Sequence, residues 1–251
     1  MFFFLTQLSF SDILLSTTIM PIMLRVVLLE GSSVSFDGCL IQFYLFAGSE
    51  AMECLLLTVM SYDRYQATCN PLHYALAVDL SFCLKAIILI WLIVLLVILM
   101  FSATMRYLDF CGPNVIDHFF CDLDPILELS CSDTFIIKIA DIILAIPLAI
   151  SPFTIIMVSY VYIITTILRI PSRTGRQKTF STCSSHLTVV SVFYLSLLTI
   201  YLFPSQESVK KILSLFYTVF TPLLNPMIYS LSNRDIKQAV EKLMRIKTSM
   251  F

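Results

Sequence analysis

Six apolar segments, each about as long as a membrane-crossing helix, constrain this chain more than any other feature. We expect spans at approximately 2–26, 38–68, 82–102, 136–169, 178–203 and 209–231. The composition agrees, because 58% of the residues are hydrophobic and only 13% are charged, about half the charge of an average soluble domain. The sequence therefore predicts one all-α membrane domain over residues 1–251, without a nucleic-acid partner.

The distribution of basic residues predicts the orientation of the chain in the membrane, since cytoplasmic loops carry an excess of Lys and Arg. If the end of the second span faces the cytoplasm, eleven of the 16 Lys and Arg residues are cytoplasmic. Acidic residues instead gather on the other side, between 109 and 133. We therefore expect the basic loops and the C-terminus to be cytoplasmic, with a basic amphipathic helix over 233–246 along the membrane. The eleven are Arg64, Lys85, Arg169, Arg173, Arg176, Lys178, Arg234, Lys237, Lys242, Arg245 and Lys247.

Several short motifs follow one another along the chain in a distinctive order. The two most specific are M-S-Y-D-R-Y at 60–65 and N-P-L-H-Y at 70–74. With the others, they resemble the signature of olfactory receptors, within the rhodopsin-like G-protein-coupled receptors. The resemblance covers nearly the whole chain and implies a seven-transmembrane receptor bundle. The other motifs are L-S-F-S-D at 8–12, H-F-F-C-D at 118–122, S-Y at 159–160, K-T-F-S-T-C-S-S-H-L at 178–187 and P-L-L-N-P-M-I-Y-S-L at 222–231.

The first span resembles the second helix of the family, so the resemblance implies that six of the seven helices are present. The family's first helix would be missing. A fragment, a misassigned start and a truncated gene are three explanations that stay open.

Arg64 lies where a long apolar segment ends, directly after Asp63. An arginine at the bilayer boundary can keep its charge among the headgroups, and Asp63 is a natural ion-pair partner. Such a pair can be broken, which is the physical outline of a switch. Pro226 removes a backbone hydrogen bond and leaves a deformable point in the last span. The resemblance implies that the activating set comprises Asp63, Arg64, Tyr65, Tyr160, Asn225, Pro226 and Tyr229.

Asp12, Glu53 and Asn225 are polar residues in three different apolar spans, where each is costly unless it is paired. By resemblance they correspond to the family's buried polar cluster, which can hold a sodium ion. Two neighbouring carboxylates favour either a bound cation or a shared proton. The expectation is thus a possible sodium site, with a protonated packing network as the alternative and no other cofactor.

Four cysteines fall on the expected extracellular side, where an oxidising environment favours disulfides with three possible connectivities. The resemblance implies the pairs Cys39–Cys121 and Cys111–Cys131. The other four, Cys54, Cys69, Cys83 and Cys183, are expected to be reduced packing residues. A metal site at His118, Cys121 and Asp122 is disfavoured, because a disulfide would consume the thiol.

Helical spacing places Phe46 and Glu50 on one face of the second span. By resemblance, that face and its counterparts line a ligand cavity in the outer half of the bundle, suited to a small apolar molecule with one polar handle. Glu50 has no counterpart in the family pattern; it is a neutral hydrogen-bonding group, a further cation ligand or a counter-ion for an amine. The candidate ligand residues are Phe46, Ala47, Glu50, Ala51, Leu144, Leu148, Tyr194, Leu197, Leu198, Tyr201, Leu215 and Thr218.

The resemblance implies a plasma-membrane odorant receptor that activates a heterotrimeric G protein of the olfactory stimulatory type. A non-signalling truncated product is the main alternative. A transporter is less favoured, since no inverted repeat or charged path across the membrane is visible. An enzyme is not expected, because the three separated His residues form no metal spacing and no nucleophile motif occurs.

Overall fold

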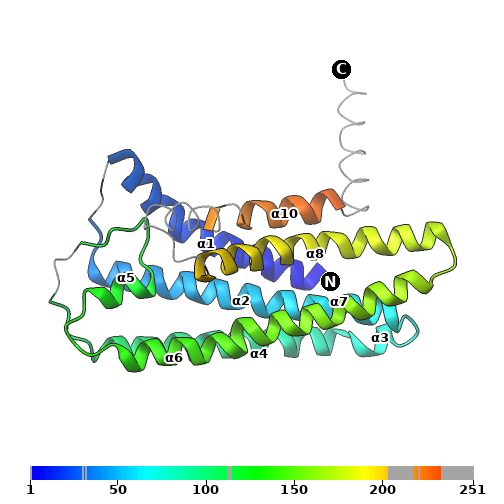
Figure 1. The fold of residues 1–251 in the computed structure, drawn as a ribbon, viewed down its shortest axis with the longest axis horizontal. Coiled ribbons are helices and arrows are strands. Elements are labelled where there is room, and N and C mark those ends of the chain that lie inside the picture. Colours follow the sequence, from blue (N-terminus) through cyan, green and yellow to red (C-terminus); the bar gives the residue numbers. More distant parts are fainter. Residues whose placement is uncertain are drawn as a thin grey trace, which may run out of the picture.

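The computed structural model describes residues 2–29, 31, 33–111, 115–202, 218–219 and 221–232. This part of the chain is helical, which confirms the all-α fold class (Figure 1). Five of its helical runs are long and apolar enough to cross a membrane. The helices are α1 (Phe2–Leu29), α2 (Phe36–Cys69), α3 (Tyr74–Ala77), α4 (Leu80–Met105), α5 (Leu123–Glu128), α6 (Phe135–Ala145), the π-helical turn η1 (Ile146–Ile150), α7 (Ser151–Arg169), α8 (Arg173–Leu202) and α10 (Thr221–Ser232).

The elements differ from the expected spans mainly at their ends. The helix α8 begins at Arg173, five residues before the expected start at 178. The short helices α3 and α5, which lie in loops, were not expected. Of the sixth expected span, the structure describes residues 218–219 and α10. The expected amphipathic helix at 233–246 lies outside the described residues.

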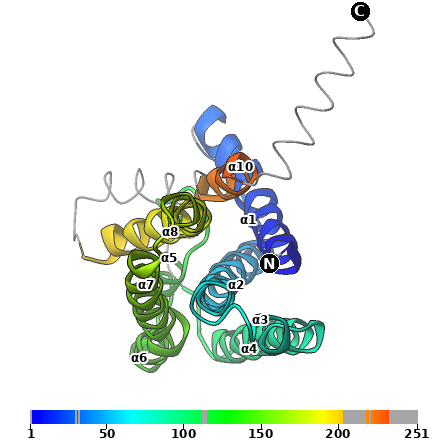
Figure 2. The ribbon, with the colours of Figure 1, turned by 90° about the vertical axis from the view of Figure 1, so that its right-hand side faces the viewer.

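The helix α2 occupies the centre of the bundle (Figure 2). It packs against α1, α4, α7 and α8, while α10 packs against α1 and α8. Close approach to α4 depends on Gly48, since a Cβ atom there would lie 2.9 Å from the Cδ1 atom of Ile98. Ser35 caps the start of α2 by accepting a hydrogen bond from the Gly38 amide at 3.1 Å. We refer below to the two ends of the bundle as the α3 end and the α5 end.

Residues 135–169 form one continuous helical run, although Pro147 and Pro152 interrupt its hydrogen bonding. Each proline lacks an N–H group and would crowd the carbonyl one turn before it. A π-helical turn over Ile146–Ile150 accommodates both prolines, since such a turn widens the helix locally. The prolines thus reshape this span where it packs against α2.

At the α5 end, the loop between α4 and α6 is fastened to the bundle. Both disulfides that the resemblance implies are present, Cys39–Cys121 and Cys111–Cys131. Gln42 adds a polar fastening: its amide nitrogen donates to the Thr18 carbonyl oxygen at 3.0 Å, and its side-chain oxygen accepts from the Cys121 amide at 3.0 Å. Because Gln42 is buried, these bonds tie α1, α2 and the loop together.

Candidate functional site

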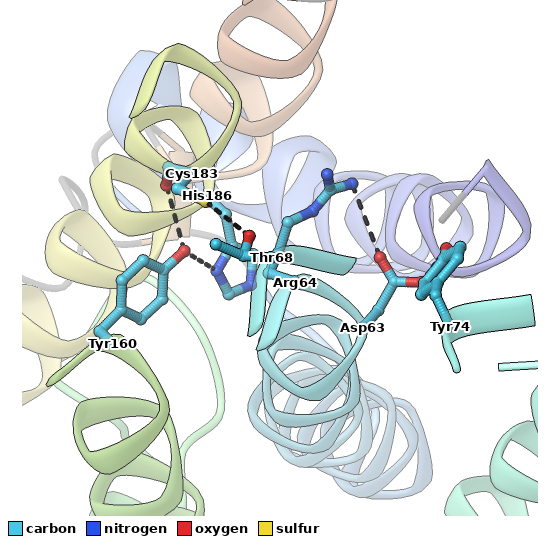
Figure 3. A network of polar contacts seen from close by, with 7 residues as sticks. All are labelled: Asp63, Arg64, Thr68, Tyr74, Tyr160, Cys183 and His186. Carbon is cyan, nitrogen blue, oxygen red and sulfur yellow. Dashed lines mark hydrogen bonds and ion pairs between the residues drawn. The ribbon is translucent and has the colours of Figure 1, made fainter. Parts of the chain in front are cut away.

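At the α3 end, one carboxylate has two polar partners (Figure 3). Asp63 is 1% exposed; one oxygen lies 3.7 Å from the Arg64 guanidinium, and the other accepts a hydrogen bond from the Tyr74 hydroxyl at 3.0 Å. Tyr74 belongs to α3, outside the membrane spans. Burial, followed by the charge and the hydrogen bond of Asp63, raises the pKa of Tyr74 to about 12, so the Tyr74 hydroxyl keeps the proton that it donates. Arg64 is 12% exposed and Asp63 is its ion-pair partner.

A second polar network connects α7 with α8 beside Arg64 (Figure 3). The Tyr160 hydroxyl donates to the Cys183 carbonyl oxygen at 3.1 Å and lies 2.8 Å from the Nδ1 atom of His186. The Tyr160 hydroxyl has one hydrogen, which it donates to the Cys183 carbonyl oxygen. The His186 Nδ1 atom therefore carries the hydrogen of the second bond and donates it to the Tyr160 oxygen. The two rings are stacked with centroids 5.8 Å apart. On α2, the Thr68 hydroxyl lies 3.9 Å from the Cys183 thiol, so this network reaches all three helices.

The third polar cluster lies deeper in the bundle and joins α1, α2 and α10. The Asn225 amide nitrogen donates to Asp12 at 3.0 Å and to Glu53 at 2.8 Å. All three residues are buried, and these hydrogen bonds bring together the three polar residues that the sequence places in different apolar spans. Several buried oxygens nearby lack a hydrogen-bond partner among the described residues: Asp12 Oδ2, Ser49 Oγ one turn before Glu53, and Thr221 Oγ1 one turn before Asn225.

Toward the α5 end, about half of the candidate ligand residues belong to two hydrophobic clusters. Phe46, Tyr194 and Leu197 are buried in the larger cluster, and Ala51 packs against it. Ala47 and Leu144 pack against the smaller cluster around Cys39 and Cys121. Glu50 and Leu148 are half-buried, Thr218 is buried, and Leu198 is 43% exposed and belongs to neither cluster.

Aromatic rings lie on both sides of the region that holds the candidate ligand residues. The rings of Phe46 and Phe120 are 5.0 Å apart, and His118 meets Phe120 edge-on at 4.6 Å. Further from the loop, Tyr194 contacts Phe153 at 4.8 Å and Phe193 at 5.1 Å. The loop thus supplies an aromatic layer above Phe46, and α7 and α8 supply a second one.

Some predicted site residues cannot be placed. Leu215 and the side chains of Tyr201, Pro226 and Tyr229 lie outside the described residues. Tyr65 is half-buried, and its ring contacts Tyr162 of α7 at 6.0 Å. Within the described ranges, no group of three or more His, Cys, Asp or Glu side chains could hold a metal ion.

Comparison with known proteins gives a consistent result along the chain. A family model described as "Olfactory receptor" matches residues 1–247. The chain is 44% identical over 250 residues to human olfactory receptor 11L1, covering 98% of this chain and 78% of that relative. It is 46% identical over 243 residues to mouse olfactory receptor 5G25, covering 96% of this chain and 76% of that relative.

The chain belongs to the olfactory receptor family. Rat olfactory receptor 1468 is a third relative, 41% identical over 254 residues, with 100% of this chain and 81% of that relative covered. The predicted family is confirmed, and the relatives that match this chain are receptors. Family membership and the apolar helices support a multi-pass protein of the plasma membrane.

Sequence reasoning missed several residues that make these polar contacts, among them Tyr74, His186, Thr68 and Gln42. Tyr74 and His186 both lie within motifs that identified the family, N-P-L-H-Y and K-T-F-S-T-C-S-S-H-L, but had no assigned role. Gln42 is a polar residue inside an apolar span, only three positions after Cys39. Three positions are about one helical turn, so this spacing could have predicted that the Gln42 side chain lies beside the disulfide of Cys39.

Replacement of Tyr160 by Phe should destabilise this olfactory receptor chain. The His186 Nδ1 and Cys183 carbonyl groups would lose their partner in a buried site, at a cost of about 1–3 kcal/mol. The matched control is Tyr162→Phe on the same helix, where Tyr162 is 57% exposed. Thermal unfolding in lipid nanodiscs should show a lower midpoint for Tyr160→Phe alone; equal midpoints in both variants would contradict the network's structural role.

Proposed function

We propose that this chain is an odorant receptor that binds small, mainly apolar molecules in the outer half of the bundle. It activates a heterotrimeric G protein of the olfactory stimulatory type through the Asp63-Arg64-Tyr65 and Asn225-to-Tyr229 segments. The observation that carries the proposal is the Asp63 carboxylate shared by Arg64 and Tyr74. A nearly buried arginine held by a breakable ion pair is suited to exchange that partner for another one.

The α3 end is the cytoplasmic end in this proposal. Eleven of the 16 basic residues support this orientation by the positive-inside rule. The disulfides support it independently, since both lie at the α5 end and disulfides persist in oxidising, extracellular surroundings. In this orientation Arg64 faces the G protein, and the loop fastened by Cys121 lies over the ligand site.

Activation would change how the helices meet at the α3 end. Tyr160 and His186 hold α7 to α8 through one hydroxyl, and Cys183 extends the contact to Thr68 on α2. Polar contacts of this kind can open and exchange partners at the α3 end, while the buried apolar residues further along α8 keep it packed in the bundle. A ligand that favours the separated state would shift the population toward it.

We also propose that the cluster of Asp12, Glu53 and Asn225 holds a sodium ion. The buried oxygens of Asp12, Ser49 and Thr221 without partners fit this, because a hard cation prefers oxygen ligands. Asp12 and Glu53 would supply the negative charge, and the Asn225 side chain already bridges them. A shared proton between the two carboxylates is the alternative that the experiment below tests.

Replacement of Arg64 by Ala should abolish the second-messenger response to odorants while surface expression persists. The reason is that Arg64 is the charged group released from Asp63 toward the G protein. Arg169→Ala is the matched control, since Arg169 is an exposed basic residue at the end of α7. Cyclic AMP and cell-surface labelling would be measured together; a full response from Arg64→Ala would overturn the switch assignment.

Sodium should raise the thermal unfolding midpoint more than the same concentration of choline, because an ion that binds the folded state stabilises it by RT ln(1 + [L]/Kd). Glu53→Gln removes one carboxylate from the cluster and should abolish the difference between the two salts. Glu128→Gln, at an exposed loop position, should keep it. Equal stabilisation of the unsubstituted chain by both salts would instead favour the shared proton.

A further inference from the structure

We propose that the ligand class of this receptor is protonated amines, with Glu50 as their counter-ion. The proposal rests on the function proposed above, because it names the ligand of the same outer-half site. It combines three observations on the described residues: the position of Glu50 on α2, the aromatic rings on both sides of that position, and the charges at the α5 end.

Glu50 is a different kind of group from the other carboxylates of the bundle. Glu53, one turn nearer the α3 end, is 1% exposed and already accepts a hydrogen bond from Asn225. Glu50 is half-buried instead, and it lies on the central helix of the bundle (Figure 2). Carboxylates inside membrane helices are costly and usually functional. Glu50 therefore extends the polar cluster toward the region where the candidate ligand residues gather.

Helical spacing places Glu50 between the two aromatic groups. Phe46, one turn toward the α5 end, contacts Phe120 of the fastened loop. Cys54, one turn toward the α3 end, is buried in the same apolar cluster as Tyr194, whose ring contacts Phe153. A carboxylate flanked by aromatic rings is the combination that recognises an ammonium group, since ring faces attract cations and the carboxylate neutralises them.

The fixed charges at the same end favour entry of a cation. Burial, followed by the charges of the neighbouring Asp124 and Asp141, raises the pKa of Asp122 to about 6, so these three carboxylates lie close together. The basic residues of the described chain near this end are Arg25 in the last turns of α1, Arg106 after α4 and Lys138 in the first turn of α6. Along α2, Arg64 is fourteen positions from Glu50, or about 21 Å at helical rise. A net negative entrance concentrates cations.

The chemistry predicts a strong preference for an amine over the alcohol with the same carbon skeleton. Both place the same apolar surface among the rings, but only the amine carries a positive charge near neutral pH. The alcohol adds no positive charge beside Glu50, whereas the ammonium group of the amine gains a charge-assisted contact with the carboxylate. We expect amines to bind about tenfold or more tightly than their alcohols.

The experiment uses the whole chain in lipid nanodiscs at neutral pH, with binding measured by thermal stabilisation over a ligand titration. The probes are three matched pairs: isoamylamine and isoamyl alcohol, cyclohexylamine and cyclohexanol, and 2-phenylethylamine and 2-phenylethanol. The variants are Glu50→Gln, which keeps the size, and Glu50→Asp, which keeps the charge. Glu128→Gln is the control that removes an exposed carboxylate outside the site.

The expected result is an amine preference in the unsubstituted chain and in Glu128→Gln that Glu50→Gln abolishes and Glu50→Asp retains in part. Equal binding of amine and alcohol by the unsubstituted chain would overturn the proposal, whether or not Glu50→Gln folds. An amine preference that survives in Glu50→Gln would also overturn the proposal. An equal loss of amine and alcohol binding in Glu50→Gln would overturn it too, because Glu50 would then act as a neutral hydrogen-bonding group.

A parallel cyclic AMP assay separates this inference from the proposed function. Glu50-dependent amine binding without any second-messenger response would leave the ligand assignment standing and refute the signalling role. A response to the alcohols that matches the response to the amines would support the signalling role and refute the ligand assignment.

Discussion

The ion pair between Asp63 and Arg64 is the interaction on which the functional account depends. The Arg64 guanidinium is only 12% exposed, so its charge is stabilised by a partner, and Asp63 supplies that partner at 3.7 Å. Tyr74 holds the opposite oxygen of the same carboxylate, so the loop helix α3 fixes the orientation of the pair. The contact is therefore specific but weak enough to exchange.

The central helix α2 connects this pair to the rest of the molecule. It carries, in order from the α5 end, the disulfide at Cys39, the fastening at Gln42, Glu50, Glu53 and finally Asp63. Gln42 meets Thr18 of α1, Glu53 meets Asn225 of α10, and Asp63 meets Tyr74 of α3. A rigid helix with polar contacts at several depths can transmit a displacement at one end to the other, because packed interiors deform little.

The sequence predicted the fold class, the family and both disulfides, because apolar segments and short motifs are local signals. It also grouped Asp12, Glu53 and Asn225, since each is an isolated polar residue in an apolar span. Contacts between side chains far apart in sequence were harder to predict. The stacking of Tyr160 on His186 depends on how α7 meets α8, and the contact of Tyr74 with Asp63 depends on a loop helix that no periodicity signals.

The most direct test of the central claim is ligand-independent signalling by Asp63→Asn. This substitution keeps the shape of the side chain and an oxygen that can accept from Tyr74, but removes the charge that holds Arg64. The account predicts cyclic AMP several-fold above the unsubstituted receptor, at matched surface levels and without odorant, since one lost charge-assisted contact of about 1.5–3 kcal/mol is enough to shift the population. Basal cyclic AMP equal to that of the unsubstituted receptor, with an unchanged odorant response, would contradict it.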